Sequence, residues 1–122
     1  MEYLDLAVRI AGQSKDKKQF YMACVARRAD GALIWSVNHA VSAQRIPEHH
    51  AEARALRKCD VGSVLYVARV LKDKTTIASA KPCDHCQSFI KNNGVKKVYF
   101  TIGPDTYGVW EPSADLWVTY EL

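Results

Sequence analysis

The sequence lacks any long apolar run. No stretch approaches the roughly 18 apolar residues that a membrane-spanning helix requires. The first six residues include Glu2 and Asp5 and contain no apolar segment, so we expect no secretory signal peptide. Internal repeats, low-complexity tracts and linker-like segments are also lacking. We therefore expect a single domain over residues 1–122, located in the cytoplasm and without contact to a membrane.

Cysteine is scarce, with four residues among 122. In a chain without an export signal, a few cysteines are more often used to bind metal than to form a disulfide framework. Cys24 lies in a predicted strand and Cys59 ends a predicted helix, so we interpret both as small buried apolar residues. Cys83 and Cys86 remain as the pair available for chemistry.

A strong excess of charge of one sign is also lacking. The formal net charge is +4, and the basic residues are scattered along the chain, with short clusters at Arg27-Arg28 and Lys96-Lys97. This balance suits an anionic ligand such as a nucleotide and does not demand nucleic acid.

The pattern of apolar residues and turn signals predicts alternating helices and strands. We expect helices over 2–14, about 48–59, and from Pro82 to about 93, strands over 20–27, 33–37, 63–71, 95–102 and 107–110, and loops over 38–46 and 72–81. The order α-β-β-α-β-α-β-β predicts an α/β fold with a five-stranded mixed sheet and helices on both faces.

Two short segments carry the strongest functional signal: His50-Ala51-Glu52 and Pro82-Cys83-Asp84-His85-Cys86. One imidazole and two thiols are ligands that zinc prefers, and three protein ligands leave a fourth position open, as in catalytic zinc sites. His-x-Glu followed by Pro-Cys-x-x-Cys is the signature of zinc-dependent nucleobase deaminases.

The predicted helices place both segments at helix starts. If these helices lie side by side, His50, Cys83 and Cys86 converge on one point. Helix N-termini favour negative charge, so we expect them to lower the pKa values of both thiols. Glu52 would face a water at the open position and shuttle protons.

The sequence resembles the cytidine deaminase superfamily over most of its length. The resemblance rests on segments 20–25, 82–90 and 104–107, on Asn38, and on the two metal-binding segments. It implies a three-layer fold whose last two strands are antiparallel, with one Zn²⁺ per chain and a homo-oligomer in which neighbouring subunits close each pocket. It also implies substrate contacts from Asn38 to the sugar, from the backbone N–H of Ala51 and carbonyl of Lys81 to the base edge, and from Phe20 to the sugar or base.

Three positions depart from the small cytidine deaminases that the chain otherwise resembles. His50 replaces their usual first cysteine ligand, as in the deoxycytidylate, tRNA and polynucleotide deaminases, and Gln87 replaces a usual arginine. One imidazole with two thiolates leaves a zinc site neutral, so no arginine is needed to offset charge. Ala40 replaces a glutamate that contacts the free sugar, so we expect a basic side chain to meet a 5′-phosphate instead.

The sequence thus predicts a zinc-dependent hydrolytic deaminase that converts cytidine, deoxycytidine or a monophosphate of either to the uracil form with release of ammonia. One alternative is deamination of cytosine or adenine within single-stranded DNA or RNA. Another is a non-catalytic zinc domain that binds nucleic acid, against which Glu52 argues because a structural site needs no such carboxylate.

Overall fold

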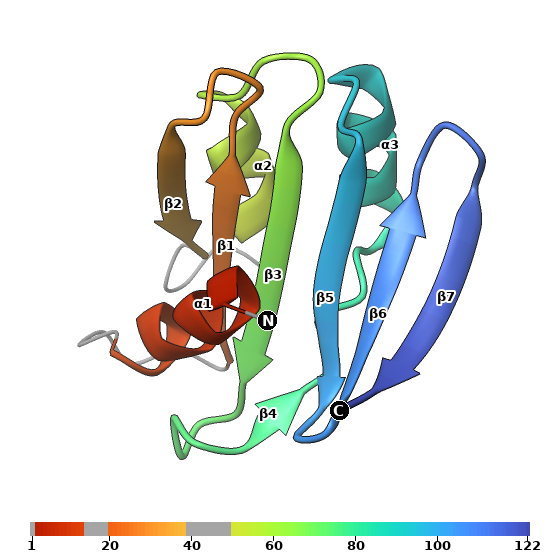
Figure 1. The fold of residues 1–122 in the computed structure, drawn as a ribbon. Coiled ribbons are helices and arrows are strands. Elements are labelled where there is room, and N and C mark those ends of the chain that lie inside the picture. The colour runs from red at the N-terminus through yellow and green to blue at the C-terminus, as the bar shows by residue number, and fades with distance from the viewer. Residues whose placement is uncertain (1, 14–19, 39–49) are drawn as a thin grey trace.

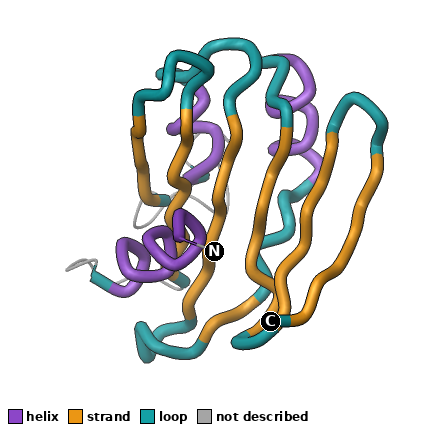
Figure 2. The backbone as a smooth tube through the Cα atoms, in the orientation of Figure 1, coloured by secondary structure: helices purple, strands orange, loops and turns teal. Residues whose placement is uncertain are grey.

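The fold is a mixed α/β arrangement, seen in a computed structural model that describes residues 2–13, 20–38 and 50–122. Figures 1 and 2 show a twisted sheet with short helices against it. Its elements in chain order are α1 (Glu2–Gly12), β1 (Tyr21–Arg27), β2 (Leu33–Val37), α2 (Ala51–Leu56), β3 (Val64–Val70), β4 (Ile77–Ala78), α3 (Asp84–Asn92), β5 (Lys97–Gly103), β6 (Thr106–Glu111) and β7 (Leu116–Glu121).

The sheet has seven strands, so the prediction of five was wrong. The strand order is β2-β1-β3-β5-β6-β7, with β4 paired to the end of β3. Among the described strands, only β3 and β5 pair in parallel. The other pairs are antiparallel, including β5 with β6, as predicted for the last two expected strands. The sequence prediction missed β4, which is only two residues long within a polar segment, and β7, whose aromatic and β-branched residues carry a strand signal.

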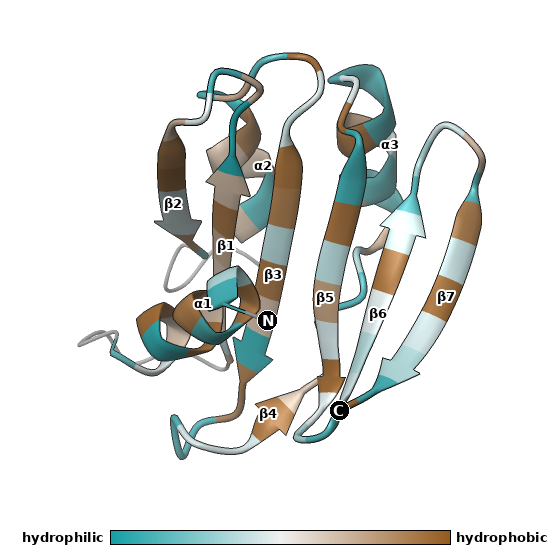
Figure 3. Ribbon diagram, in the orientation of Figure 1, coloured by the Kyte–Doolittle hydropathy of each residue, from teal (hydrophilic) through white to brown (hydrophobic). Residues whose placement is uncertain are grey.

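Side chains alternate between the two faces of the sheet, and helices cover both. On one face, Leu4 and Ala7 of α1 pack against Val25 and Tyr66. On the other face, α2 and α3 pack against the sheet. The buried helix residues are Ala51, Ala55, Leu56, Cys86 and Ile90, and the strand residues that they cover are Cys24, Leu65, Val67 and Phe100. Figure 1 shows α1 in front of the sheet and α2 and α3 behind it, and Figure 3 shows hydrophobic residues recurring along the central strands.

The helices α2 and α3 begin at the same end of the sheet. Figure 1 shows the connections from α2 to β3 and from α3 to β5 at the upper end, so both helix N-termini point to the end where β3 and β5 finish. Within the described residues, α2 spans Ala51–Leu56, shorter than predicted. The N-cap of α3 is Cys83, so Pro82 precedes the helix rather than occupying its first turn.

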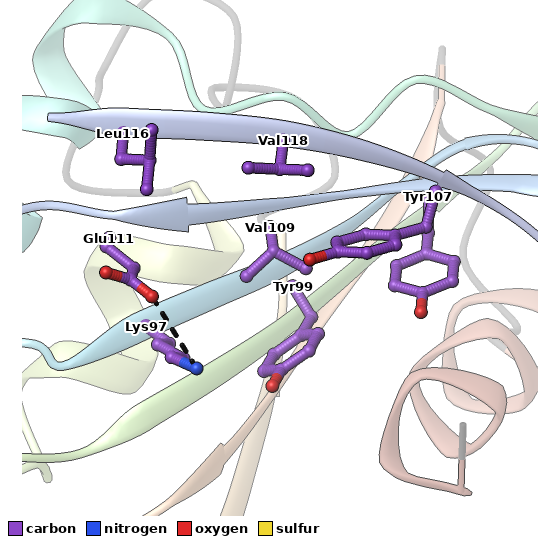
Figure 4. Close-up of a pocket in the computed structure, with 8 residues that line it drawn as sticks. Lys97, Tyr99, Tyr107, Val109, Glu111, Leu116 and Val118 are labelled. Atoms are coloured by element: carbon purple, nitrogen blue, oxygen red, sulfur yellow. Dashed lines mark ion pairs between the residues drawn. The ribbon is translucent and has the colours of Figure 1, made fainter.

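A hollow lies over the exposed face of β5, β6 and β7. Its lining includes Lys97, Tyr99, Glu111 and Tyr120, and it has a volume of about 370 Å³ (Figure 4). An ion pair of 3.6 Å joins Lys97 to Glu111. Because Tyr99 packs with the α1 cluster, this hollow opens on the face opposite α2 and α3. Among the described helices, none is long and apolar enough to cross a membrane.

The packing of β5 on β6 requires a glycine at one position. A Cβ atom on Gly108 would overlap the ring of Phe100, which lies directly across from it. We expect Gly108→Ala to lower the free energy of unfolding by about 1–3 kcal/mol, the usual cost of overpacking a core. Urea denaturation would measure this. Gly103→Ala is the matched control, since a Cβ there meets no atom within 4 Å; equal stability of the two variants would contradict the prediction.

Candidate active site

The structure brings together the three predicted metal ligands. One donor atom from each of His50, Cys83 and Cys86 lies within 4.8 Å of the others. His50 Nδ1 is 3.3 Å from Cys86 Sγ and 3.6 Å from Cys83 Sγ. The predicted convergence of the two helix starts is therefore confirmed.

The first residues of α2 and α3 carry the metal-ligand side chains, and the helix backbones do not hydrogen-bond the side chains of His50 and Cys83. His50 and Cys83 are the N-caps of α2 and α3, both with extended backbone, and neither side chain forms a capping hydrogen bond. Their backbone carbonyls accept the first helical hydrogen bonds, from Arg54 N at 3.0 Å and from Gln87 N at 2.8 Å. Cys86 is one turn into α3 and is fully buried. The backbone groups are thus satisfied locally while the imidazole and the thiols remain available.

Glu52 lies beside this cluster as a buried carboxylate. It is 2% exposed, and its Oε1 atom has no hydrogen-bond partner in the described part of the chain. Burial raises the pKa of Glu52, while the nearby His50 and a hydrogen bond with Cys86 oppose that rise. Buried polar atoms are nearly always hydrogen-bonded, so a carboxylate oxygen left unpaired by the described residues indicates that a further polar group completes the site.

Zinc fits these residues. An imidazole nitrogen and two thiol sulfurs match the ligand preference of zinc, and three ligands with an orphaned carboxylate oxygen next to them match a site that accepts water or substrate. The group His50, Cys83 and Cys86 can thus hold one zinc ion.

The prediction that helix starts lower both thiol pKa values was wrong for Cys86. Burial raises the pKa of Cys86 well above its usual value, and the charges of Glu52 and Cys83 act in the same direction. Burial, which disfavours the charged thiolate, is the largest cause of this rise. The positive charge of a bound metal, rather than the helix, is what would keep this sulfur deprotonated.

The predicted sugar contacts, Asn38 and Phe20, lie together at the start of β1. Asn38 is buried, and its side-chain Oδ1 accepts a hydrogen bond of 3.0 Å from Met22 N. Its Nδ2 donates to the carbonyl of Phe20 at 3.2 Å. Asn38 thus joins the end of β2 to the beginning of β1, and its contact with a sugar stays a prediction.

The predicted base-edge contacts come from the segments that carry the metal ligands. Ala51 is buried directly after His50, and its carbonyl accepts a hydrogen bond of 2.5 Å from Ser36 Oγ. Lys81 is exposed two residues before Cys83, with its ammonium 4.7 Å from the centre of the Trp117 ring. Each residue lies within two positions of a metal ligand in the sequence, and their roles toward a base stay predictions.

Sequence reasoning missed two residues that hold the first turn of α2 in place. Ser36 bonds the carbonyl of Ala51, and Arg54 Nη1 donates to the carbonyl of Val37 at 2.7 Å. Both hydrogen bonds join α2 to β2, and each links residues at least 15 positions apart in the sequence. Neither Ser36 nor Arg54 belongs to a local sequence motif.

Gln87 and Ala40 are two positions at which the sequence departs from the small cytidine deaminases. Gln87 Nε2 donates to the carbonyl of Pro82 at 2.9 Å, so this neutral side chain braces the backbone just before Cys83. Ala40 lies outside the described residues.

Comparison with known proteins agrees with the geometry. The family model of the cytidine and deoxycytidylate deaminase zinc-binding region matches residues 1–102, a range that contains all three ligands and Glu52. No curated protein and no solved structure matches the chain. Since the family match covers most of the 122 residues, the chain belongs to the cytidine and deoxycytidylate deaminase superfamily.

Proposed function

We propose that residues 1–122 form a single catalytic domain that hydrolytically deaminates a free cytosine nucleoside or nucleotide to its uracil form, releasing ammonia. The observation that carries this proposal is the buried Glu52 oxygen, which no described residue hydrogen-bonds, beside the three metal ligands. A purely structural zinc site would gain nothing from this carboxylate and would bear the cost of burying it. The non-catalytic alternative is therefore disfavoured.

The reaction needs a nucleophile and a series of proton transfers. Zinc held by His50, Cys83 and Cys86 would supply a Lewis acid that lowers the pKa of a water molecule. Glu52 Oε1 then accepts a proton from the water that adds to C4 of the cytosine ring. Glu52 would pass that proton to the ring nitrogen, then take the proton of the hydroxyl now on C4 and give it to the amino group, which leaves as ammonia as the C4–N bond breaks and the C4 carbonyl forms.

The substrate contacts follow from the family resemblance and the positions of the residues. The Ala51 N–H and the Lys81 carbonyl would bind the base edge, since each adjoins a metal-ligand segment. Phe20 and Asn38 would contact the sugar, and their mutual hydrogen bond of 3.2 Å fixes one relative to the other. A homo-oligomer that closes the pocket across an interface remains part of the proposal, because closure strengthens electrostatic contacts by excluding water.

A second candidate function is deamination within single-stranded DNA or RNA. One observation favours it: Trp35 is 60% exposed beside Arg54, Arg57 and Lys58, which line a shared surface hollow. Aromatic and basic side chains together are typical of single-strand binding. The basic clusters noted in the sequence give less support, because Arg28 lies near Asp30 and Asp60, and Lys97 near Glu111.

Ammonia release from a panel of substrates tests the proposal. We expect turnover of cytidine, deoxycytidine or their 5′-monophosphates to exceed that of a cytosine-containing oligonucleotide. Adenosine compounds serve as the control for base identity. Faster turnover of the oligonucleotide than of every monomeric compound would favour the second candidate, and no turnover of any monomeric cytosine compound would refute the proposal.

A further inference from the structure

Arg69 lies on the same face of the sheet as the metal cluster. In β3, Leu65 and Val67 pack in the core beneath α2 and α3, and Arg69 follows at the next position of the same parity. The residues between them, Tyr66 and Ala68, pack against α1 on the other face. Since alternate residues of a strand share a face, the Arg69 side chain leaves β3 on the α2 and α3 side.

The position along the strands places Arg69 just beyond the catalytic residues. Cys24 pairs with Val67 in the sheet, and both belong to the buried core cluster that contains Ala51 and Cys86. The next row on this face pairs Met22 with Arg69. That row is roughly 7 Å further toward the end of β3, since a strand rises about 3.3 Å per residue.

The predicted sugar contacts lie in this same corner. The guanidinium carbon of Arg69 is 5.0 Å from the centre of the Phe20 ring. Asn38 bonds both Phe20 and Met22, the residue paired with Arg69. The two predicted sugar contacts, Phe20 and Asn38, and the cationic side chain of Arg69 therefore lie together at this end of β1 and β3.

The charge of Arg69 has no counter-charge among the described residues. Its Nε atom is buried without a hydrogen-bond partner, and no described carboxylate forms an ion pair with it. Buried charged groups in proteins are normally paired. Stacking on Phe20 holds the guanidinium group in place, and no described residue accepts a hydrogen bond from its Nε atom.

We propose that Arg69 binds the 5′-phosphate of a mononucleotide and makes the enzyme prefer nucleotides over nucleosides. This inference rests on the proposed function. A guanidinium offers paired donors in the geometry of phosphate oxygens. A phosphate would satisfy the Nε donor that the described residues leave unpaired. The expected phosphate contact is thereby assigned to β3, a part of the chain that no sequence motif marked.

The test compares Arg69→Gln and Arg69→Lys with Arg9→Gln, a matched control on an exposed position of α1, on the opposite face. Isothermal calorimetry with the products uridine 5′-monophosphate and uridine measures binding without turnover. We expect wild type to bind the monophosphate more tightly than the nucleoside. Arg69→Gln should weaken monophosphate binding about 10- to 100-fold, the effect of losing a charged hydrogen bond, and nucleoside binding far less.

Arg69→Lys should give an intermediate loss, because it keeps the charge and loses the paired donors. Arg9→Gln should behave as wild type. Equal weakening of uridine and its monophosphate by Arg69→Gln would assign Arg69 a structural role and overturn the proposal. A larger loss for oligonucleotide turnover than for mononucleotide turnover would assign the phosphate to a polynucleotide and also overturn it.

Inorganic phosphate provides a measurement on the wild-type chain, which is informative even if Arg69→Gln does not fold. Phosphate should compete with uridine 5′-monophosphate and not with uridine, and the absence of competition would overturn the proposal. If no cytosine compound is deaminated, the proposed function fails, whereas these binding experiments still decide whether Arg69 recognises phosphate.

Discussion

Glu52→Gln is expected to lower kcat about 10⁴-fold or more while the chain keeps its fold and its zinc. A single general acid–base group is typically worth about 10²- to 10⁴-fold in rate, and Glu52 would serve several proton transfers in one turnover. Glutamine has the same shape and is not ionised, so the buried site loses its proton carrier without gaining a cavity. Because burial disfavours the charged carboxylate of Glu52, the variant should also be at least as stable as wild type.

The measurements are ammonia release, metal content and thermal unfolding. Glu111→Gln is the matched control, since Glu111 is partly exposed and pairs with Lys97 on the open face of β5 to β7. It should leave turnover unchanged. Near-normal turnover of Glu52→Gln would show that another group carries the protons.

Cys86→Ala is expected to abolish both zinc binding and activity. Removing even an outer-shell partner of a metal ligand costs about 10- to 100-fold in affinity or activity, and removing a ligand should cost more. Zinc at about 100 times its Kd would stabilise the wild-type fold by about 2.7 kcal/mol, and this stabilisation should vanish in the variant. Metal analysis and thermal unfolding with and without added zinc measure the two effects.

Cys59→Ala provides the control for loss of a thiol. Cys59 is half-buried at the end of the α2 region, and its Sγ donates to the carbonyl of Ala55 at 3.3 Å, away from the metal cluster. It should retain zinc and zinc-dependent stabilisation. A Cys86→Ala variant that still holds one zinc per chain would exclude Cys86 as a ligand.

Local pattern was sufficient for much of the fold. The strand at 33–37 was predicted at its observed bounds, and α1, β1, β3 and β5 within a few residues. Each carries an apolar periodicity or a turn signal such as Asp30-Gly31 that acts over a few residues. The two missed strands show where this reasoning fails: β4 depends on pairing with Arg69 and Val70, and β7 depends on pairing along the whole of β6.

The sequence by itself determined the chemistry of the metal ligands, because the His-x-Glu and Cys-x-x-Cys spacings place suitable side chains at helix starts regardless of the rest of the chain. Only the tertiary structure decided the properties that depend on burial and on distant neighbours. Burial reversed the expected pKa direction for Cys86, and it left a Glu52 oxygen without a hydrogen-bond partner among the residues that the structure describes. The pairing of β1 with β3 likewise placed Arg69 beside Phe20, which lies 49 positions earlier in the chain. Desolvation and cross-strand contacts are set by what packs around a residue, and so they cannot be inferred from the residues beside it in sequence.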